Sequence, residues 1–249
     1  LVELLRVGSR EKALVAALVH WADVDYDEDA KKARLIEAAA LAESAFQDSA
    51  LAIRCYEKVL DVDGGHPLAL DHLVRLEREA GNHERVADLL ETRIEVEMDP
   101  DARLSLRKQL AATHAALERV TDAISAWQGA LDEAPEDLDA IGALERLYEA
   151  TERWGDLEAL VERRLEIART PEESIAARVR LARLAESPFG RRDDAIEQLR
   201  EILEEDANNA EALDELERLH TSAQEWVELV ALLERRAAEP PDGGGGGAA

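Results

Sequence analysis

The sequence predicts an all-α protein, built as a solenoid of antiparallel helical hairpins. Charged residues make up 35% of the 249-residue chain and aromatic residues only 4%, a composition typical of long helical arrays with narrow apolar faces. Clusters of Val, Ile, Thr and Tyr that would indicate strands are nearly absent. The apolar residues also repeat at a long and regular spacing, which indicates a repeat architecture.

The repeat has a period of about 71 residues. Ala52-Ile53 recurs as Ala123-Ile124 and again as Ala195-Ile196, at spacings of 71 and 72 residues. Three sets of leucines keep the same register: Leu60, Leu131 and Leu203; Leu73, Leu144 and Leu216; Leu89, Leu160 and Leu232. The one-residue slip is best placed at residues 187–190, Ser-Pro-Phe-Gly, where a turn can absorb it.

Each period predicts four helices. In the middle period these are expected at residues 101–117, 121–133, 137–150 and 154–169, because apolar side chains three and four residues apart form one stripe on each helix. Thr170-Pro171, with Glu173 three residues after the threonine, predicts a capping box. Asp99-Pro100 is expected to start a helix in the same way. The short connections place successive helices antiparallel.

Residues 1–240 are expected to form one solenoid that is a fragment of a longer array. Residues 10–24 align with the last helix of a period, and residues 1–7 are an apolar remnant of whatever precedes it, so the chain is expected to begin inside the array. Residues 241–249 include five consecutive glycines. They predict a flexible tail or linker rather than a helix.

The formal net charge of −26 bears on the partners that the chain can bind. Such an acidic surface disfavours nucleic acids and anionic membranes, and it complements basic peptides or basic patches on proteins. Alternatively, the charge only keeps a long molecule soluble. No apolar stretch of about 18 residues is present, so no membrane-spanning helix is expected. The single cysteine, Cys55, excludes an internal disulfide and is expected to be a buried structural thiol.

The sequence contains none of the motifs that would indicate an active site. No phosphate-binding glycine loop, nucleophile elbow or HExxH motif is present. His66 and His72 lie on either side of a helix start, with Asp61, Asp63 and Asp71 nearby, and a metal site there is the less favoured alternative. Residues 61–65, Asp-Val-Asp-Gly-Gly, resemble the start of a calcium loop, but the remaining ligand spacing, including the closing glutamate, is wrong, so they indicate a turn between helices. We therefore expect no catalytic residue, no metal site and no cofactor, and predict that the protein is not an enzyme.

The hairpins resemble the tetratricopeptide repeat (TPR). The residues that carry the resemblance are Ala111 and the pattern Ala123-x3-Trp127-x2-Ala130-x4-Pro135. The alternate hairpins depart from it, with Leu157 and Arg164 where small residues are expected, so TPR-like and diverged hairpins alternate within the period. The resemblance covers residues 9–238. It implies a right-handed superhelix whose concave groove is lined by the first helix of every hairpin and binds a protein or peptide.

A series of basic residues is the candidate partner-binding site. Arg75, Arg146 and Arg218 share one register, and the resemblance implies that this position points into the groove. A guanidinium there could grip carboxylates or phosphates bidentately. Lys108 and Arg183 complete the candidate set. The alternative is that each arginine of the series pairs on its own helix with one acidic residue: Asp71, Glu145 or Asp214.

Trp154 and Trp226 share a register at the start of a helix, and we expect them to pack between hairpins rather than to anchor a partner.

These features predict a non-catalytic protein–protein interaction scaffold or assembly subunit. The alternative is a regulatory or sensor repeat module, attached to an enzyme or envelope machine encoded elsewhere in a longer chain. RNA-reading helical repeats need basic groove positions, which a charge of −26 disfavours. Only five of the 30 basic residues are lysines, a bias that suggests a bacterial source. We expect a cytoplasmic protein that takes part in a larger complex.

Overall fold

The computed structural model describes residues 11–238, and it places helices and no strands among them. The contacts divide the chain into two compact units, the first ending at Ala140 and the second beginning at Ile141. The glycine-rich tail and the apolar segment at residues 1–7 lie outside the described residues. The helices are α2 (Glu11–Val24), α3 (Glu28–Phe46), α4 (Ser49–Val62), α5 (Pro67–Glu79), α6 (His83–Val96), α7 (Pro100–Ala116), α8 (Val120–Glu133), α9 (Leu138–Ala150), α10 (Trp154–Ile167), α11 (Pro171–Glu186), α12 (Arg192–Glu205), α13 (Ala210–Ser222) and α14 (Trp226–Ala238).

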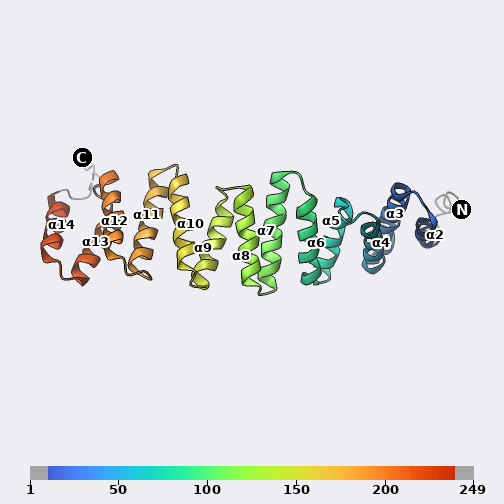
Figure 1. Cartoon of the computed structure of the whole chain (residues 1–249), viewed down its shortest axis with the longest axis horizontal. Coiled ribbons are helices and arrows are strands. Elements are labelled where there is room, and N and C mark those ends of the chain that lie inside the picture. The colour runs from blue at the N-terminus through green and yellow to red at the C-terminus, as the bar shows by residue number, and fades with distance from the viewer. Residues whose placement is uncertain (1–10, 239–249) are drawn as a thin grey trace, which may run out of the picture. The chain divides into compact units, whose positions relative to one another are not determined.

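Unit 1 contains α2 to α8, and each of these helices packs against the next (Figure 1). We call α3, α5, α7, α9, α11 and α13 the first helices of their hairpins, and α4, α6, α8, α10, α12 and α14 the second helices.

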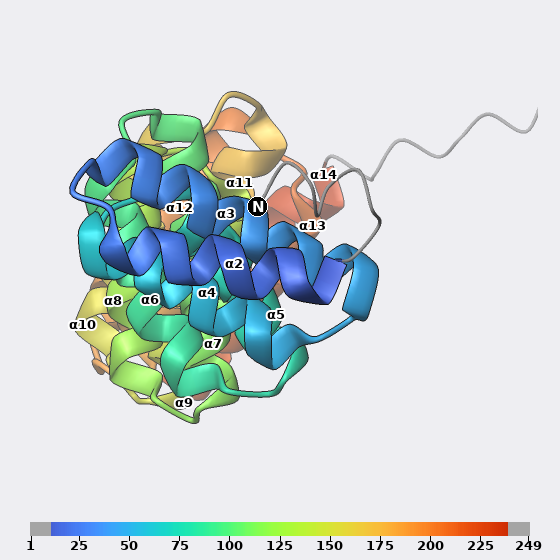
Figure 2. The same ribbon diagram turned by 90° about the vertical axis from the view of Figure 1, so that its right-hand side faces the viewer.

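Figure 2 shows α2 lying across the N-terminal end of unit 1, in front of α3 and α4. Buried leucines, alanines and valines from the successive helices form the core, together with Tyr56. Cys55 is 2% exposed, which confirms the predicted buried thiol.

Unit 2 contains most of α9 together with α10 to α14. Helices α10 to α14 pack each against the next, and an ion pair between Glu145 and Arg164 joins α9 to α10. The apolar core includes Val179, Leu199, Ile202, Leu216 and Leu219. The fold class predicted from the sequence, an all-helical solenoid of antiparallel hairpins, is thus confirmed within each unit.

The helix boundaries agree with the predicted ones to within two residues, because the start signals act as expected. The backbone N–H of Glu173 donates to the Thr170 hydroxyl at 3.2 Å, and the backbone N–H of Thr170 donates to the Glu173 carboxylate at 3.3 Å. This is the predicted capping box. Asp99 caps α7 as predicted, accepting from the backbone N–H of Asp101 at 3.3 Å. His66 caps α5 through its ring nitrogen Nδ1.

One residue in the left-handed region of the backbone lies in the turn of every hairpin among the described residues. The six residues, with φ between 52° and 77°, are Gln47, Gly81, Glu118, Glu152, Gly190 and Gln224. They fall into two series with the spacings of 71 and 72 residues that the leucines show. The turn from α11 to α12 is two residues longer than the turn from α7 to α8, and α11 is one residue shorter than α7. The net difference of one residue confirms the predicted position of the slip.

Candidate partner-binding surface

All five predicted partner-binding residues lie on first helices. Arg75 is on α5 and Lys108 on α7, both in unit 1, whereas Arg146 on α9, Arg183 on α11 and Arg218 on α13 belong to unit 2. Four of the five are held by carboxylates of the same unit, as the following contacts show. The fifth, Arg146, is exposed and forms no ion pair with any residue that the structure describes.

Arg75 belongs to a cluster around the carboxylate of Glu43 on the preceding first helix, α3. The Arg75 guanidinium donates to this carboxylate and to Glu79, the latter at 3.1 Å. His72 Nδ1 lies 3.0 Å from Glu43 Oε1, and the rings of His72 and Tyr56 stack with centroids 4.8 Å apart. Burial raises the pKa of Glu43, but hydrogen bonds from Tyr56 and Arg75 outweigh burial and hold the pKa below its ordinary value.

Arg183 and Arg218 form a second cluster, between α11 and α13. Arg183 donates to Glu211 at 2.9 Å and to Glu215 at 3.1 Å. Arg218 donates to Glu186 on the preceding first helix at 2.9 Å and to Glu215 at 2.9 Å. Hydrogen bonds to Glu186 and Glu215 raise the pKa of Arg218 further above its ordinary value.

Lys108 of α7 is held at the start of α9. Its ammonium lies 2.7 Å from Asp137 and 3.0 Å from Asp139. Hydrogen bonding to Asp137 raises the pKa of Lys108, so the lysine is charged and paired at neutral pH.

The ion pairs that the sequence suggested within single helices are wrong in their partners. Asp71 pairs with Arg93 of α6, Glu145 with Arg164 of α10, and Asp214 with Arg236 of α14. Each of these pairs joins the two helices of one hairpin. Arg75 and Arg218 do pair on their own helices, but with Glu79 and Glu215. Each also reaches a glutamate 32 residues earlier, on the neighbouring first helix. The signal that could have found them is the hairpin spacing itself, because it places residues about one hairpin apart side by side.

Other contacts repeat this arrangement along the first helices. Arg78 of α5 donates to Gln109 of α7 at 3.0 Å in unit 1, and Arg180 of α11 pairs with Glu149 of α9 in unit 2. Together with the two clusters they form what we call the first-helix ladder: Glu43–Arg75, Arg78–Gln109, Glu149–Arg180, Arg183–Glu215 and Glu186–Arg218. The ladder bridges neighbouring first helices within each unit.

The two tryptophans differ, although they share a register. Trp154 is half-buried, as the packing interpretation predicts, whereas Trp226 is 58% exposed among the described residues. The packing interpretation is therefore wrong for Trp226. It lies on α14 with other exposed apolar side chains, Val227, Val230 and Leu233.

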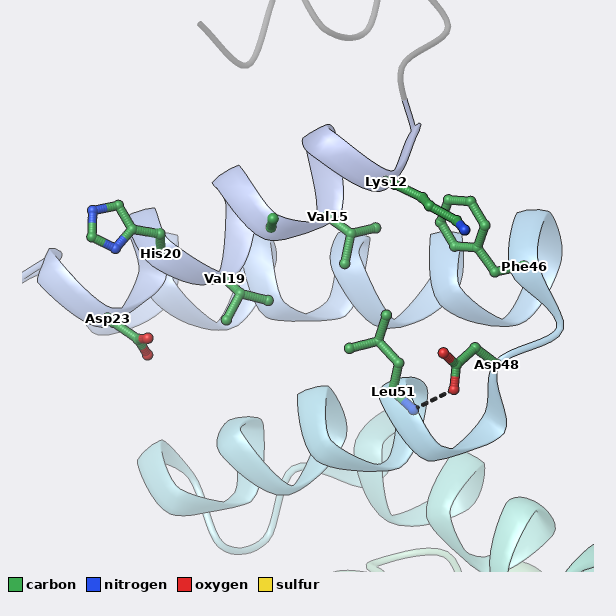
Figure 3. A pocket seen from close by; sticks show the side chains of 9 residues that line it. Lys12, Val15, Val19, His20, Asp23, Phe46, Asp48 and Leu51 are labelled. Atoms are coloured by element: carbon green, nitrogen blue, oxygen red, sulfur yellow. Dashed lines mark hydrogen bonds between the residues drawn. The ribbon is translucent and has the colours of Figure 1, made fainter.

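A pocket of about 650 Å³ lies beside α2 in unit 1, and no sequence motif predicted it. Figure 3 shows Val15 and Val19 of α2 pointing toward Leu51 at the start of α4, while Phe46 lies at one end. The Lys12 ammonium lies 5.8 Å from the centroid of the Phe46 ring. The pocket thus has an apolar floor and a rim of both charge signs.

Among residues 11–238 the structure contains no group of three or more His, Cys, Asp or Glu that is placed to hold a metal ion. His66 and His72 instead serve as a helix cap and as a contact of Glu43. No helix in the same range is both long and apolar enough to cross a membrane.

Comparison with known proteins places the hairpins in a known class. The tetratricopeptide repeat model matches residues 140–174 and 212–244. These residues cover the α9–α10 and α13–α14 hairpins, so the model matches the alternate hairpins that we expected to be the diverged ones. Among curated protein sequences, none matches this chain significantly.

Several solved structures are similar in fold. A structure of Naa15/Naa10 bound to HypK-THB has a TM-score of 0.54 at 14% identity, and the match covers 82% of this chain and 31% of that one. The MamA protein matches with a TM-score of 0.42 at 20% identity, covering 72% of this chain and 93% of MamA. YrrB, described as a TPR protein with an unusual peptide-binding site, matches with a TM-score of 0.41 at 17% identity, covering 73% and 89%. At these identities the likeness concerns the fold alone.

Proposed function

Because the chain is a tetratricopeptide-like helical repeat protein, we propose that it is a non-catalytic scaffold that binds a protein or peptide partner along its first helices. Repeats of this class generally mediate protein–protein interaction. The observation that supports the first helices as the binding surface is the first-helix ladder. It ties neighbouring helices together across their exposed faces, so a partner would meet a surface that is already ordered and would lose less conformational entropy on binding.

The charge of the chain supports a partner that presents basic groups. With 56 acidic and 30 basic residues, the protein attracts cationic segments and steers their approach. Such attraction is screened over about 8 Å at physiological ionic strength. The charge therefore acts mainly on the rate of association, whereas contacts on the first helices set the lifetime of the complex.

Affinity capture with two matched variants tests this proposal. Ala112 of α7 and Ala176 of α11 are exposed on first helices, whereas Ala50 of α4 and Ala159 of α10 are exposed on second helices. We expect Ala112→Trp with Ala176→Trp to release a partner captured from lysate of the source organism, because the two indoles obstruct the first-helix surface. The control, Ala50→Trp with Ala159→Trp, should retain the partner. Loss with the control alone would move the interface to the second helices and refute the proposal.

A further inference from the structure

The two outer members of the arginine series show what this register binds in the protein itself. Arg75 is held by Glu43 from the preceding first helix and by Glu79 one turn further along its own helix. Arg218 is held in the same way by Glu186 from the preceding first helix and by Glu215 on its own helix. At both positions the guanidinium has two carboxylate partners. The arginine of this register therefore binds carboxylates in both outer periods.

The middle period has none of these carboxylates at the equivalent positions, although it has the arginine. His114 stands 32 residues before Arg146, where the outer periods have Glu43 and Glu186. Ala150 occupies the register of Glu79, and Ala143 occupies that of Glu215. Arg146 is exposed, as Arg75 and Arg218 are, but unlike them it forms no ion pair with a described residue. The middle period therefore has the arginine of this register without the carboxylates that hold it in the outer periods.

The surface around Arg146 is also cleared of side chains. Gly142, one turn earlier on α9, stands at the register of Asp71 and Asp214, and a Cβ built there would meet nothing within 4 Å. Ala150, one turn later, is exposed. Gly142, Arg146 and Ala150 are four residues apart and share one stripe of the helix. A partner's backbone can approach such a stripe more closely than it could the Asp71–Arg75–Glu79 stripe of α5.

Acidic side chains close to Arg146 on α9 are already engaged. Glu145 accepts from Arg164 at 3.1 Å, and Glu149 pairs with Arg180 of α11. Neither needs Arg146 to balance its charge. A carboxylate that reaches Arg146 would therefore break no ion pair, whereas at Arg75 or Arg218 it would have to displace two glutamates.

We propose that Arg146, on the cleared stripe of α9, binds a carboxylate of the protein or peptide partner. The carboxylate is either an Asp or Glu side chain or a free C-terminus, because both present the two oxygens that a guanidinium grips bidentately. This inference rests on the proposed function, since it names one recognition point on the first-helix surface. The acidic surface and Arg146 act on different groups of the same partner. The acidic surface attracts the partner's basic side chains, and Arg146 binds a carboxylate and so sets the position of the partner along the first helices.

Binding to an array of synthetic 12-residue peptides, made with both amidated and free C-termini, tests the inference at 150 mM salt. Arg146→Gln removes the cation, and Ala150→Glu supplies the internal carboxylate that Arg75 finds in Glu79. The matched control is Arg200→Gln, which removes an exposed arginine of the second helix α12 that forms no ion pair with a described residue. Circular dichroism checks that each variant is folded.

We expect peptides that bind the parent protein to lose about tenfold or more in affinity for Arg146→Gln and for Ala150→Glu, but not for Arg200→Gln. Replacing Asp or Glu by its amide, or amidating the C-terminus, then tells which carboxylate binds. Equal binding to the parent and to Arg146→Gln would overturn the inference and leave the proposed function intact, provided that Ala112→Trp with Ala176→Trp still abolishes binding. Peptide binding that survives both changes, or no peptide binding at all, would overturn both.

Discussion

At the scale of single residues, the ion pairs follow the packing of hairpins more than the helix on which each residue lies. The Glu43 carboxylate forms hydrogen bonds with Tyr56 of α4 and with His72 and Arg75 of α5. A sequence offers acidic residues three or four positions from an arginine as its natural partners. It cannot rank these against residues one hairpin away, because both kinds of pair contribute only about 0–1 kcal/mol at a surface.

The repeat predicted on which helices the candidate residues lie, but not which of them form ion pairs. The register placed Arg75, Arg146 and Arg218 on first helices, and the structure agrees. Which of the three has an ion pair depends on residues elsewhere in the chain: Glu43 and Glu186 hold Arg75 and Arg218, whereas the residue 32 positions before Arg146 in the sequence is His114. The difference can be read from the sequence only after the structure has shown that residues 32 apart meet.

Glu225 gives a residue-scale prediction for the dependence of stability on pH. Its carboxylate accepts from Arg192 at 2.7 Å and lies 2.7 Å from His220 Nδ1. The hydrogen bond from Arg192, followed by that from His220, lowers the pKa of Glu225 from 4.5 to about 2. The folded state therefore binds this proton less readily than the unfolded state. The stabilisation that Glu225 supplies is complete above pH 4.5 and is lost as the pH falls toward 2.

We expect Glu225→Gln to lower the melting temperature most at neutral pH, and the gap to the parent protein to close between pH 4.5 and 2. Thermal unfolding followed by circular dichroism across that range measures the gap. Glu204→Gln, an exposed glutamate of α12 without an ion pair to a described residue, is the control. A gap that stays constant with pH would show that Glu225 does not act through its charge.

At the scale of helices and turns, the sequence predicts the elements well and the turn conformations poorly. Apolar spacing and caps such as Thr170 set the helix ends. The left-handed residue of each turn is glycine only at Gly81 and Gly190. At Gln47, Glu118, Glu152 and Gln224 the side chain gives no hint of a positive φ, because these residues are held there by the packing of the two helices.

The turns give an element-scale prediction of opposite sign at two equivalent positions. Glu152→Gly should stabilise unit 2 by about 0.5–1 kcal/mol, since glycine relieves the left-handed strain. Gly81→Ala should destabilise unit 1 by about 1 kcal/mol. A Cβ at Gly81 would meet no atom within 4 Å, so its cost comes from the backbone alone.

Urea unfolding of each variant measures these free energies. Glu152→Ala is the control, because alanine removes the charge but keeps the strain, and we expect it to be nearly neutral. Equal effects of Glu152→Gly and Glu152→Ala would mean that the side chain, and not the backbone conformation, determines stability at this turn.

At the scale of the whole chain, the period of about 71 residues predicts the fold because each hairpin repeats the packing of the one before. The same logic fails where neighbours differ. Trp154 and Trp226 share a register, but α10 packs against α11, whereas among the described residues no helix follows α14. The pocket beside α2 is a second such case, because its shape depends on which helices meet and not on any motif. The register of a residue specifies its position in the repeat, but it does not specify which neighbouring helices pack against that position.

Hydrogen exchange of the chain with and without its captured partner tests the central claim most directly. The claim is that a partner binds along the first helices. We predict slower amide exchange in α3, α5, α7, α11 and α13 on binding, with the protection in α9 centred on Arg146, and little change in α4, α6, α8 and α12. Protection confined to the second helices, or to the exposed apolar face of α14, would contradict the account.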